Sequence, residues 1–259
     1  GLVLNYFFGT KVNAAQGIAA QIRGQLGVFS SVLMKALNPI LAKSEGSGNR
    51  NLLLTATISG AKISSLLLVL FYVPILIELP TILNFWLTTV PEYTIIFCRI
   101  LLSYTLIEQM FIPLETAIAA EGNIKKYQKI SSVLNFMPIV FAFVFFLLNK
   151  EPYFLYISFF VGVLLKVTNT LFYAKLQLNQ PILKYLNQVV FKVLIVFVIG
   201  LLITKLSTFF ISDNLLRVII VIFISSSLFI MNSYLFGLNT NEKQKLLEFK
   251  KIILNKFNK

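Results

Sequence analysis

Apolar stretches long enough to cross a lipid bilayer follow one another along nearly the whole chain. A helical span needs about 20 apolar residues, because the hydrocarbon core is about 30 Å thick and a helix rises about 1.5 Å per residue. The pattern predicts an all-α fold, a polytopic transmembrane helical bundle that begins with a stub, Gly1–Phe8, closed by Gly9. Seven full spans are expected after it: Val12–Lys43, Asn51–Leu76, Glu92–Ala120, Lys129–Leu148, Tyr153–Lys175, Gln188–Phe210 and Leu215–Gly237.

The first full span has one face of small and polar residues. At about 100° per residue this face holds Asn13, Gln16, Gly17, Ala20, Gly24, Gly27, Ser31, Lys35 and Asn38. Such a face suits either close packing against another helix or the wall of a cavity. Arg23 lies at the edge of the face and favours the cavity, because packing alone does not require a charge.

Four ionisable side chains lie near the middle of their spans, where a charge is costly unless it faces protein or water. They are Arg23, Lys62, Glu108 and Lys166. Glu108 shares a helix face with Glu115, and two roles stay open for it: neutralising a nearby base, or binding a substrate or ion. Prolines within the spans, Pro113 and Pro138, are expected to bend their helices, as in transporters with moving gates.

The positive charges alternate between connections. The net charge is +13, and loops rich in Lys and Arg alternate with poor ones along the chain. Since positive loops stay on the cytoplasmic side, the C-terminus is expected to be cytoplasmic and Lys11 to face outward. The same distribution argues against nucleic acid as a partner. The basic tail, residues 238–259, is expected to form an amphipathic helix on the membrane surface or a charged stop after the last span.

Several kinds of chemistry lack their residues in this chain. It has no His, and its one Cys, Cys98, lies in an apolar segment, so neither a metal site nor an intrachain disulfide is expected. The loops are short and carry no catalytic motif, so we expect no enzyme and no cofactor. The chain starts at Gly1 within an apolar stretch, which we interpret as a cut through a longer protein.

Two stretches resemble a known family. The run from Asn5 to Gly48 contains FFG, the entry NAAQGIAAQI, and Asn38-Pro39 before a Lys-Ser-Glu-Gly turn. The later run PLETAIAAEGNIKKYQ, Pro113–Gln128, is similar to the same family. This family is the Wzx-type lipid-linked oligosaccharide flippases of the MATE-like transporter superfamily. The resemblance covers most of the chain and is strongest over its first half.

The resemblance implies two helical lobes that face a central cavity and work by alternating access. Residues 1–237 would be the second, C-terminal lobe. The cationic residues Arg23 and Lys62 would then meet the diphosphate of a polyprenol carrier. The full set of substrate-path candidates is Arg23, Lys62, Lys166, Asn13, Gln16, Ser31 and Lys35. The expected location is the bacterial inner membrane, with membrane lipids, a lipid-linked oligosaccharide and a polysaccharide polymerase or assembly proteins as partners.

Three functions remain in competition at this point. The first is export of a polyprenyl-diphosphate-linked oligosaccharide for cell-surface polysaccharide such as lipopolysaccharide, which suits the excess of bases over acids within the spans. The alternative is a MATE-type multidrug exporter coupled to Na⁺ or H⁺, with Glu108 or Glu115 as the ion-binding carboxylate. The third is a scaffold for glycan-assembly enzymes, against which the polar helix faces count.

Overall fold

The structure is a computed structural model that describes residues 1–212, 214–244 and 248. Its described residues form helices and no strand, and seven helical segments are long and apolar enough to cross a membrane. The elements are α1 (Leu2–Gly46), α2 (Arg50–Trp86), α3 (Thr94–Glu121), α4 (Lys125–Leu147), α5 (Phe154–Leu178), α6 (Ile182–Tyr185), η1 (Leu186–Val190), α7 (Phe191–Ser207), η2 (Thr208–Phe210), α8 (Leu215–Asn232) and η3 (Ser233–Gly237). The chain is therefore a multi-pass helical membrane protein, as the hydrophobic pattern predicts.

The predicted break at Gly9 is present, but the stub is not a separate element. Gly9 has φ 77° and ψ −174° inside α1, so the helix kinks there and continues to Gly46. A positive φ costs glycine little because it has no Cβ. The stub and the first span are thus two arms of one kinked element.

Two span boundaries differ from the sequence pattern. α2 continues to Trp86 through Pro74 and Pro80, which places Glu78 within the helix and not in the following loop. The prolines are tolerated because neighbouring helices can satisfy the backbone groups that they free. The sixth span begins at Ile182, directly after Pro181, and runs through the π-helical turn η1 without a break into α7.

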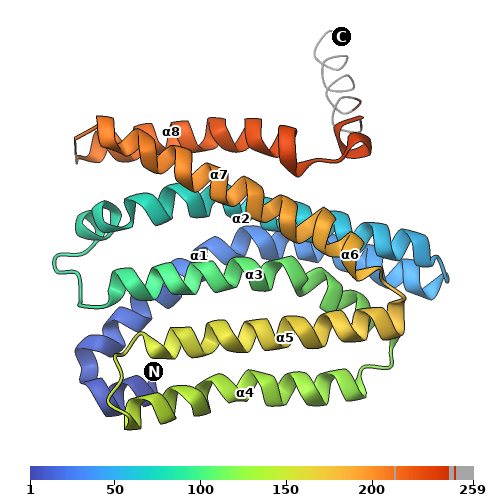
Figure 1. Cartoon of the computed structure of the whole chain (residues 1–259), viewed down its shortest axis with the longest axis horizontal. Coiled ribbons are helices and arrows are strands. Elements are labelled where there is room, and N and C mark those ends of the chain that lie inside the picture. Colours follow the sequence, from blue (N-terminus) through green and yellow to red (C-terminus); the bar gives the residue numbers. More distant parts are fainter. Residues whose placement is uncertain (213, 245–247, 249–259) are drawn as a thin grey trace.

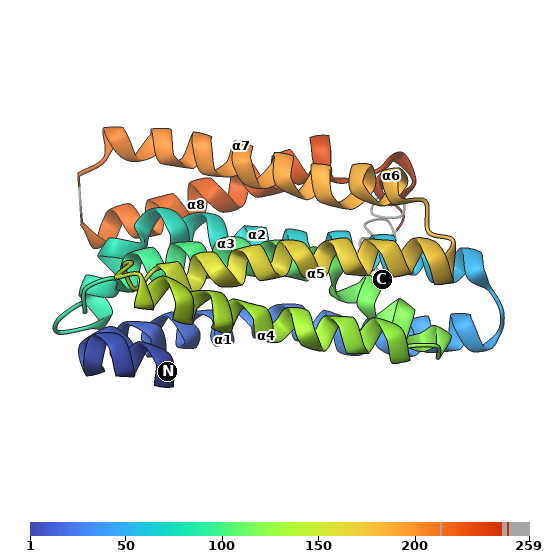
Figure 2. The ribbon, with the colours of Figure 1, turned by 60° about the horizontal axis from the view of Figure 1, so that its bottom comes forward.

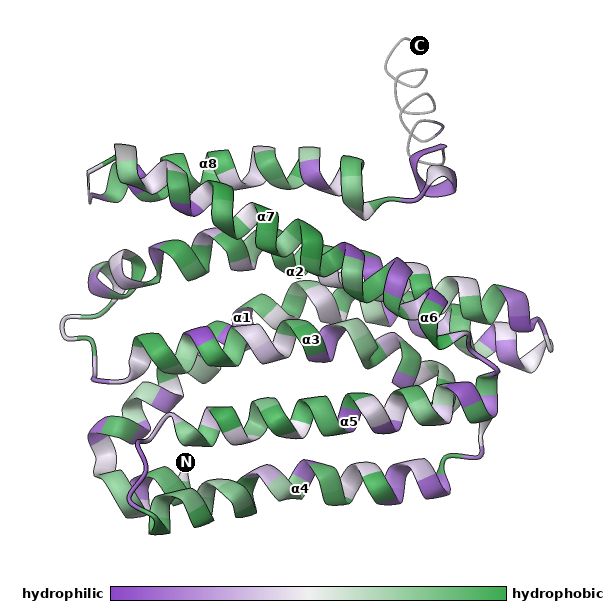
Figure 3. Ribbon diagram, viewed as in Figure 1, coloured by the Kyte–Doolittle hydropathy of each residue, from purple (hydrophilic) through white to green (hydrophobic). Residues whose placement is uncertain are grey.

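α2 lies at the centre of the arrangement and packs against α1, α3, α7 and α8. Figure 1 shows α4 and α5 along one edge of the molecule and the α7–α8 pair along the other, and Figure 2 shows the same helices turned by 60°. Hydrophobic residues predominate along most helices (Figure 3), and many large apolar side chains are exposed, which suits contact with lipid. Two buried clusters fill the interior: one around Tyr72, Leu102 and Tyr185, the other around Ala15 and Phe97.

The two ends of the bundle differ in charge. One end, which we call the basic end, carries the turns after α1, α3 and α5 and the segment after η3 (at the right in Figure 1). At the opposite end, the hydroxyl of Tyr93 donates to Glu151 over 2.7 Å and so joins two loops. This hydrogen bond raises the pKa of Tyr93 to about 12, because a phenolate could not donate to the carboxylate.

The last span ends at Gly237, where the sequence pattern placed the end of the membrane domain. After it, Asn239 and Glu242 pack back onto the bundle. Most of the expected amphipathic tail, Lys243–Lys259, lies outside the described residues.

Candidate functional site

Four charged side chains from three helices form a continuous set near the middle of the bundle. Arg23 Nη2 of α1 lies 3.3 Å from Glu108 Oε2 of α3. Lys166 Nζ of α5 lies 3.7 Å from Glu108 Oε1 and 3.1 Å from Glu115 Oε1. We call this set the charge chain. Its two cations balance its two carboxylates, so each charge has a partner at a depth where an isolated charge would be costly.

The two cations of the charge chain differ in exposure. The side chain of Arg23 is 48% exposed, whereas that of Lys166 is 16% exposed and lies between two carboxylates. A guanidinium has five N–H donors, and among the described residues Arg23 uses one of them, toward Glu108. Arg23 is therefore the cation that can also bind a ligand, while Lys166 holds α3 and α5 together.

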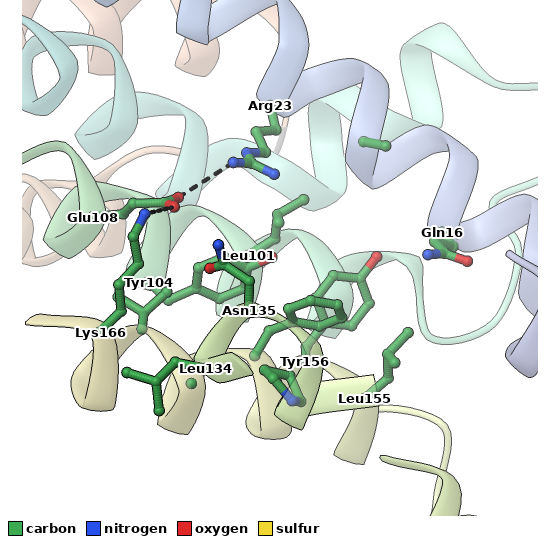
Figure 4. A pocket seen from close by; sticks show the side chains of 15 residues that line it. Gln16, Arg23, Leu101, Tyr104, Glu108, Leu134, Asn135, Leu155, Tyr156 and Lys166 are labelled. Carbon is green, nitrogen blue, oxygen red and sulfur yellow. Dashed lines mark hydrogen bonds and ion pairs between the residues drawn. The ribbon is translucent and has the colours of Figure 1, made fainter. Parts of the chain in front are cut away.

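A cavity of about 370 Å³ opens beside the charge chain, between α1, α3, α4 and α5 (Figure 4). Its lining is Gln16, Ala20, Arg23, Leu101, Tyr104, Glu108, Leu134, Asn135, Pro138, Leu155, Tyr156, Phe159, Gly162, Val163 and Lys166. Aromatic rings and apolar side chains form most of the wall, and two amides add donors and acceptors. The Oε1 atom of Gln16 is buried and has no hydrogen-bond partner among the described residues, so it can accept from a ligand or a water molecule.

A second cavity of about 330 Å³ lies between α1, α2 and α3. Arg23 and Glu108 line this cavity as well as the first, so their ion pair stands between the two. Small and polar residues of α1, Gly27, Ser30 and Ser31, form part of the second wall. The hydroxyl of Ser30 is buried and has no partner among the described residues.

Hydrogen bonds hold the helices around the second cavity. The hydroxyls of Tyr72 and Thr105 lie 3.2 Å apart and join α2 to α3. One turn further along α3, Gln109 donates to Ser64 over 3.1 Å. These two contacts join α2 to α3 through neutral polar groups, separately from the Arg23–Glu108 pair, which joins α1 to α3.

The two candidate prolines lie at packing contacts. Pro138 of α4 lines the first cavity, and a Cβ built on Gly162 of α5 would lie 2.3 Å from its ring carbon Cγ. Gly162 therefore permits the close approach of α4 and α5. Pro113 lies in α3, one turn after Met110, whose carbonyl accepts a hydrogen bond from the buried hydroxyl of Tyr185. α3 curves in this half (Figure 1), as expected where proline removes a backbone hydrogen bond.

The structure brings most of the candidate site residues together. Those at the two cavities or in the charge chain are Gln16, Arg23, Ser31, Glu108, Glu115, Pro138 and Lys166. Both candidate carboxylates face a cation, Glu108 the guanidinium of Arg23 and Glu115 the ammonium group of Lys166.

Three candidates lie elsewhere. Lys62 is fully buried at the basic end, where its ammonium group lies 2.6 Å from Glu242. Lys35 is exposed on α1 beyond the second cavity, and Asn13 lies toward the kinked N-terminal arm, near Gly1. The face of α1 on which both were placed is much longer than either cavity, so helical periodicity alone could not tell which part of it is lined.

Some lining residues are not among the candidates predicted from the sequence. Tyr104, Tyr156 and Asn135 line the first cavity, and Tyr72 lines the second. An aromatic side chain in an apolar span packs in a core as often as it lines a cavity, so only the packing of α3 against α5 identifies these residues. The described residues contain no cluster of three His, Cys, Asp or Glu side chains that could hold a metal ion.

Comparisons with known proteins found no match for the chain. No protein-family profile, no curated protein and no solved structure matches the chain. The likeness to the polysaccharide-export family therefore remains a prediction from the motifs of the sequence.

Proposed function

We propose that the chain is part of a flippase that moves a polyprenyl-diphosphate-linked oligosaccharide across the bacterial inner membrane for cell-surface polysaccharide. The observation that carries the proposal is the half-exposed guanidinium of Arg23, which lies near the middle of α1 between two cavities. A permanent cation at that position favours an anionic ligand, and its fork of donors matches phosphate oxygens.

The charge chain allows Arg23 to exchange Glu108 for a bound diphosphate. When a diphosphate binds Arg23, Glu108 loses that partner but keeps Lys166, which lies 3.7 Å from its other oxygen. No carboxylate is then left without a nearby cation. The exchange therefore costs less than breaking an isolated pair, in which one charge would be stranded in the membrane.

The walls of the first cavity suit a sugar. Gln16 and Asn135 supply amide donors and acceptors for hydroxyl groups, and Tyr104, Tyr156 and Phe159 supply flat apolar surface. The side of α1 at Gly17 and Gly24 has no neighbouring atom within 4 Å of a Cβ built there, so this side is open to a further element. A second lobe would occupy that side, as the family resemblance implies.

The proposed orientation in the membrane follows from the distribution of positive charge along the sequence. The basic end would face the cytoplasm, which puts the segment after η3 on the cytoplasmic side. Membrane lipids surround the apolar faces, and a polysaccharide polymerase or assembly proteins would take up the exported product.

The alternative is a MATE-type multidrug exporter coupled to Na⁺ or H⁺. One observation favours it: Glu108 and Glu115 both lie in the charge chain, where a carboxylate could exchange its lysine for an ion or a cationic drug. The half-exposed Arg23 counts against it, because a cation at the cavity wall repels a cationic drug.

Ligand binding distinguishes the two functions. The purified chain in lipid nanodiscs is titrated with farnesyl diphosphate, farnesyl monophosphate and the tetraphenylphosphonium cation. We expect farnesyl diphosphate to bind best, and Arg23→Ala to weaken it about tenfold, since a charge-assisted hydrogen bond is lost. Lys35→Ala, an exposed base on the same helix, is the matched control and should bind as the wild type does. Strong binding of tetraphenylphosphonium that Glu108→Gln abolishes would support the exporter instead.

A further inference from the structure

A third cavity lies at the basic end, away from the charge chain. It is an open cleft of about 300 Å³ between α2, the α6–η1 turn and the segment after η3. Thr55 and Ser59 line it from successive turns of α2. Lys184 and Gln188 face them from α6 and η1, and Glu242 closes the third side.

Two lysines fix the third side of the cleft. The ammonium group of Lys62, which is fully buried, lies 2.6 Å from Glu242 Oε2. The same carboxylate oxygen accepts a hydrogen bond of 2.7 Å from the backbone N–H of Asn239. Lys192 of α7 donates to the side chain of Asn239. The segment after η3 is therefore held on α2 and α7, and the cleft is a formed feature of the bundle.

The surroundings of the cleft have an excess of positive charge. Glu242 is the one acidic residue of the lining, and Lys62, Lys243 and Glu242 all lie close enough to Lys192 to act on its charge. Lys184 adds a further ammonium group on the lining itself. Lys184 is thus the cation on the lining, and Lys62 and Lys192 contact the lining residues Glu242 and Asn239.

The donors of the cleft are unused. The side chains of Thr55, Ser59 and Gln188 make no hydrogen bond to a described residue, and Lys184 makes no ion pair with one. Two hydroxyls, an amide and an ammonium group thus line one cleft of about 300 Å³. Hydrophilic residues gather at this end of α2 and α6 in Figure 3.

We propose that this cleft binds a phosphate group. Lysine and hydroxyl donors are the usual partners of phosphate oxygens, and basic pockets between transmembrane helices hold lipid headgroups. The phosphate could belong to an anionic phospholipid whose chains lie against the apolar faces of α2 and α6, or to a soluble compound. The proposal does not depend on the function proposed for the charge chain, because no residue is shared between the two sites.

The test compares anionic with zwitterionic lipid. The chain is assembled into nanodiscs that hold phosphatidylglycerol and phosphatidylcholine in equal amounts. Native mass spectrometry then counts the lipids that stay bound to the protein when it is released from the nanodisc. We expect an excess of bound phosphatidylglycerol over phosphatidylcholine. This excess should fall about fivefold in the variant that combines Lys184→Ala with Thr55→Val, because one cation is removed. Both side chains are exposed, so the variant should fold, and its thermal unfolding is recorded to verify this. The matched control is Lys125→Ala, an exposed lysine at the same end outside the cleft.

A second arm identifies the source of the phosphate. Binding of radiolabelled inorganic phosphate to the detergent-solubilised chain is measured by equilibrium dialysis for the same three proteins. Selective loss of phosphatidylglycerol in the cleft variant assigns a lipid headgroup. Selective loss of inorganic phosphate, without an excess of bound phosphatidylglycerol, assigns a soluble phosphate compound. Equal binding of both probes by the wild type and the cleft variant would overturn the proposal.

Discussion

Arg23 is the residue on which the proposed mechanism depends most. Its pair with Glu108 is partly exposed, with 48% and 25% of the two side chains accessible, so screening by water keeps its contribution to folding small. We expect Arg23→Ala, made in the gene that carries this sequence, to abolish glycan export while protein levels stay near normal. Arg23→Lys should keep partial activity, because the charge remains and the bidentate geometry is lost. Surface glycan, divided by membrane-inserted protein, measures both effects.

The paired charges also allow a purely structural role to be recognised. If Arg23 serves only to neutralise Glu108, then Arg23→Ala should lower the amount of inserted protein, and the exchanged pair Arg23→Glu with Glu108→Arg should restore it. Normal glycan per inserted protein in Arg23→Ala would remove this residue from the mechanism.

Lys166 should matter more for stability than Arg23 does. It is the most buried member of the charge chain and lies beside both carboxylates, so its loss leaves Glu115 without its cation. We expect Lys166→Met to destabilise the bundle by about 3 kcal/mol, the usual range for breaking a buried pair. Thermal unfolding in detergent measures this, with Lys35→Met as the control at an exposed base. Adding Glu115→Gln should recover part of the loss, and equal unfolding temperatures for the two lysine variants would contradict a structural role for Lys166.

At the scale of elements, the contact between α4 and α5 determines the width of the first cavity. A Cβ on Gly162 would lie 2.3 Å from Pro138 Cγ, and the proline ring is part of the backbone and cannot turn away. Gly162→Ala should therefore push the two helices apart and cost about 1–3 kcal/mol. Gly17→Ala, where no atom lies within 4 Å, should be neutral or stabilising by thermal unfolding. Pro138→Ala should relieve the strain of Gly162→Ala, and an unchanged unfolding temperature for Gly162→Ala alone would contradict the close contact.

The elements themselves were largely predictable from sequence, because a bilayer requires long apolar helices and the chain supplies them. The position of the break at Gly9 followed from residue type, but its form did not, because the helix kinks there and continues. The end of α2 did not follow either: Glu78 reads as a loop residue, but it is buried 2.8 Å from Arg217 of α8, a partner 139 positions away. Lys62 was predicted to lie on the substrate path because the local sequence does not show its partner. That partner, Glu242, lies 180 positions further along the chain. Local patterns indicate which residues face inward but not which distant charge they meet.

The orientation of the whole molecule in the membrane can be tested by thiol labelling. Cys98 is fully buried and is replaced first. Single cysteines are then placed at Asn123, in the exposed turn after α3, and at Thr88, in the exposed loop after α2. An impermeant reagent on intact cells should label position 88 and not position 123, since the basic end is expected to face the cytoplasm. Gln180 in the third turn is 1% exposed and would not report on sidedness.

The proposed function of the whole molecule is movement of a lipid-linked oligosaccharide between leaflets. Cells that lack the gene carrying this sequence are compared with cells that express it, and the polyprenyl-diphosphate-linked oligosaccharide is quantified in each leaflet by its access to an impermeant sugar-modifying enzyme. We expect the oligosaccharide to accumulate in the inner leaflet when the protein is missing. Wild type should restore the outer-leaflet pool, whereas Arg23→Ala should not. The same distribution between leaflets with and without the protein would contradict the proposed function.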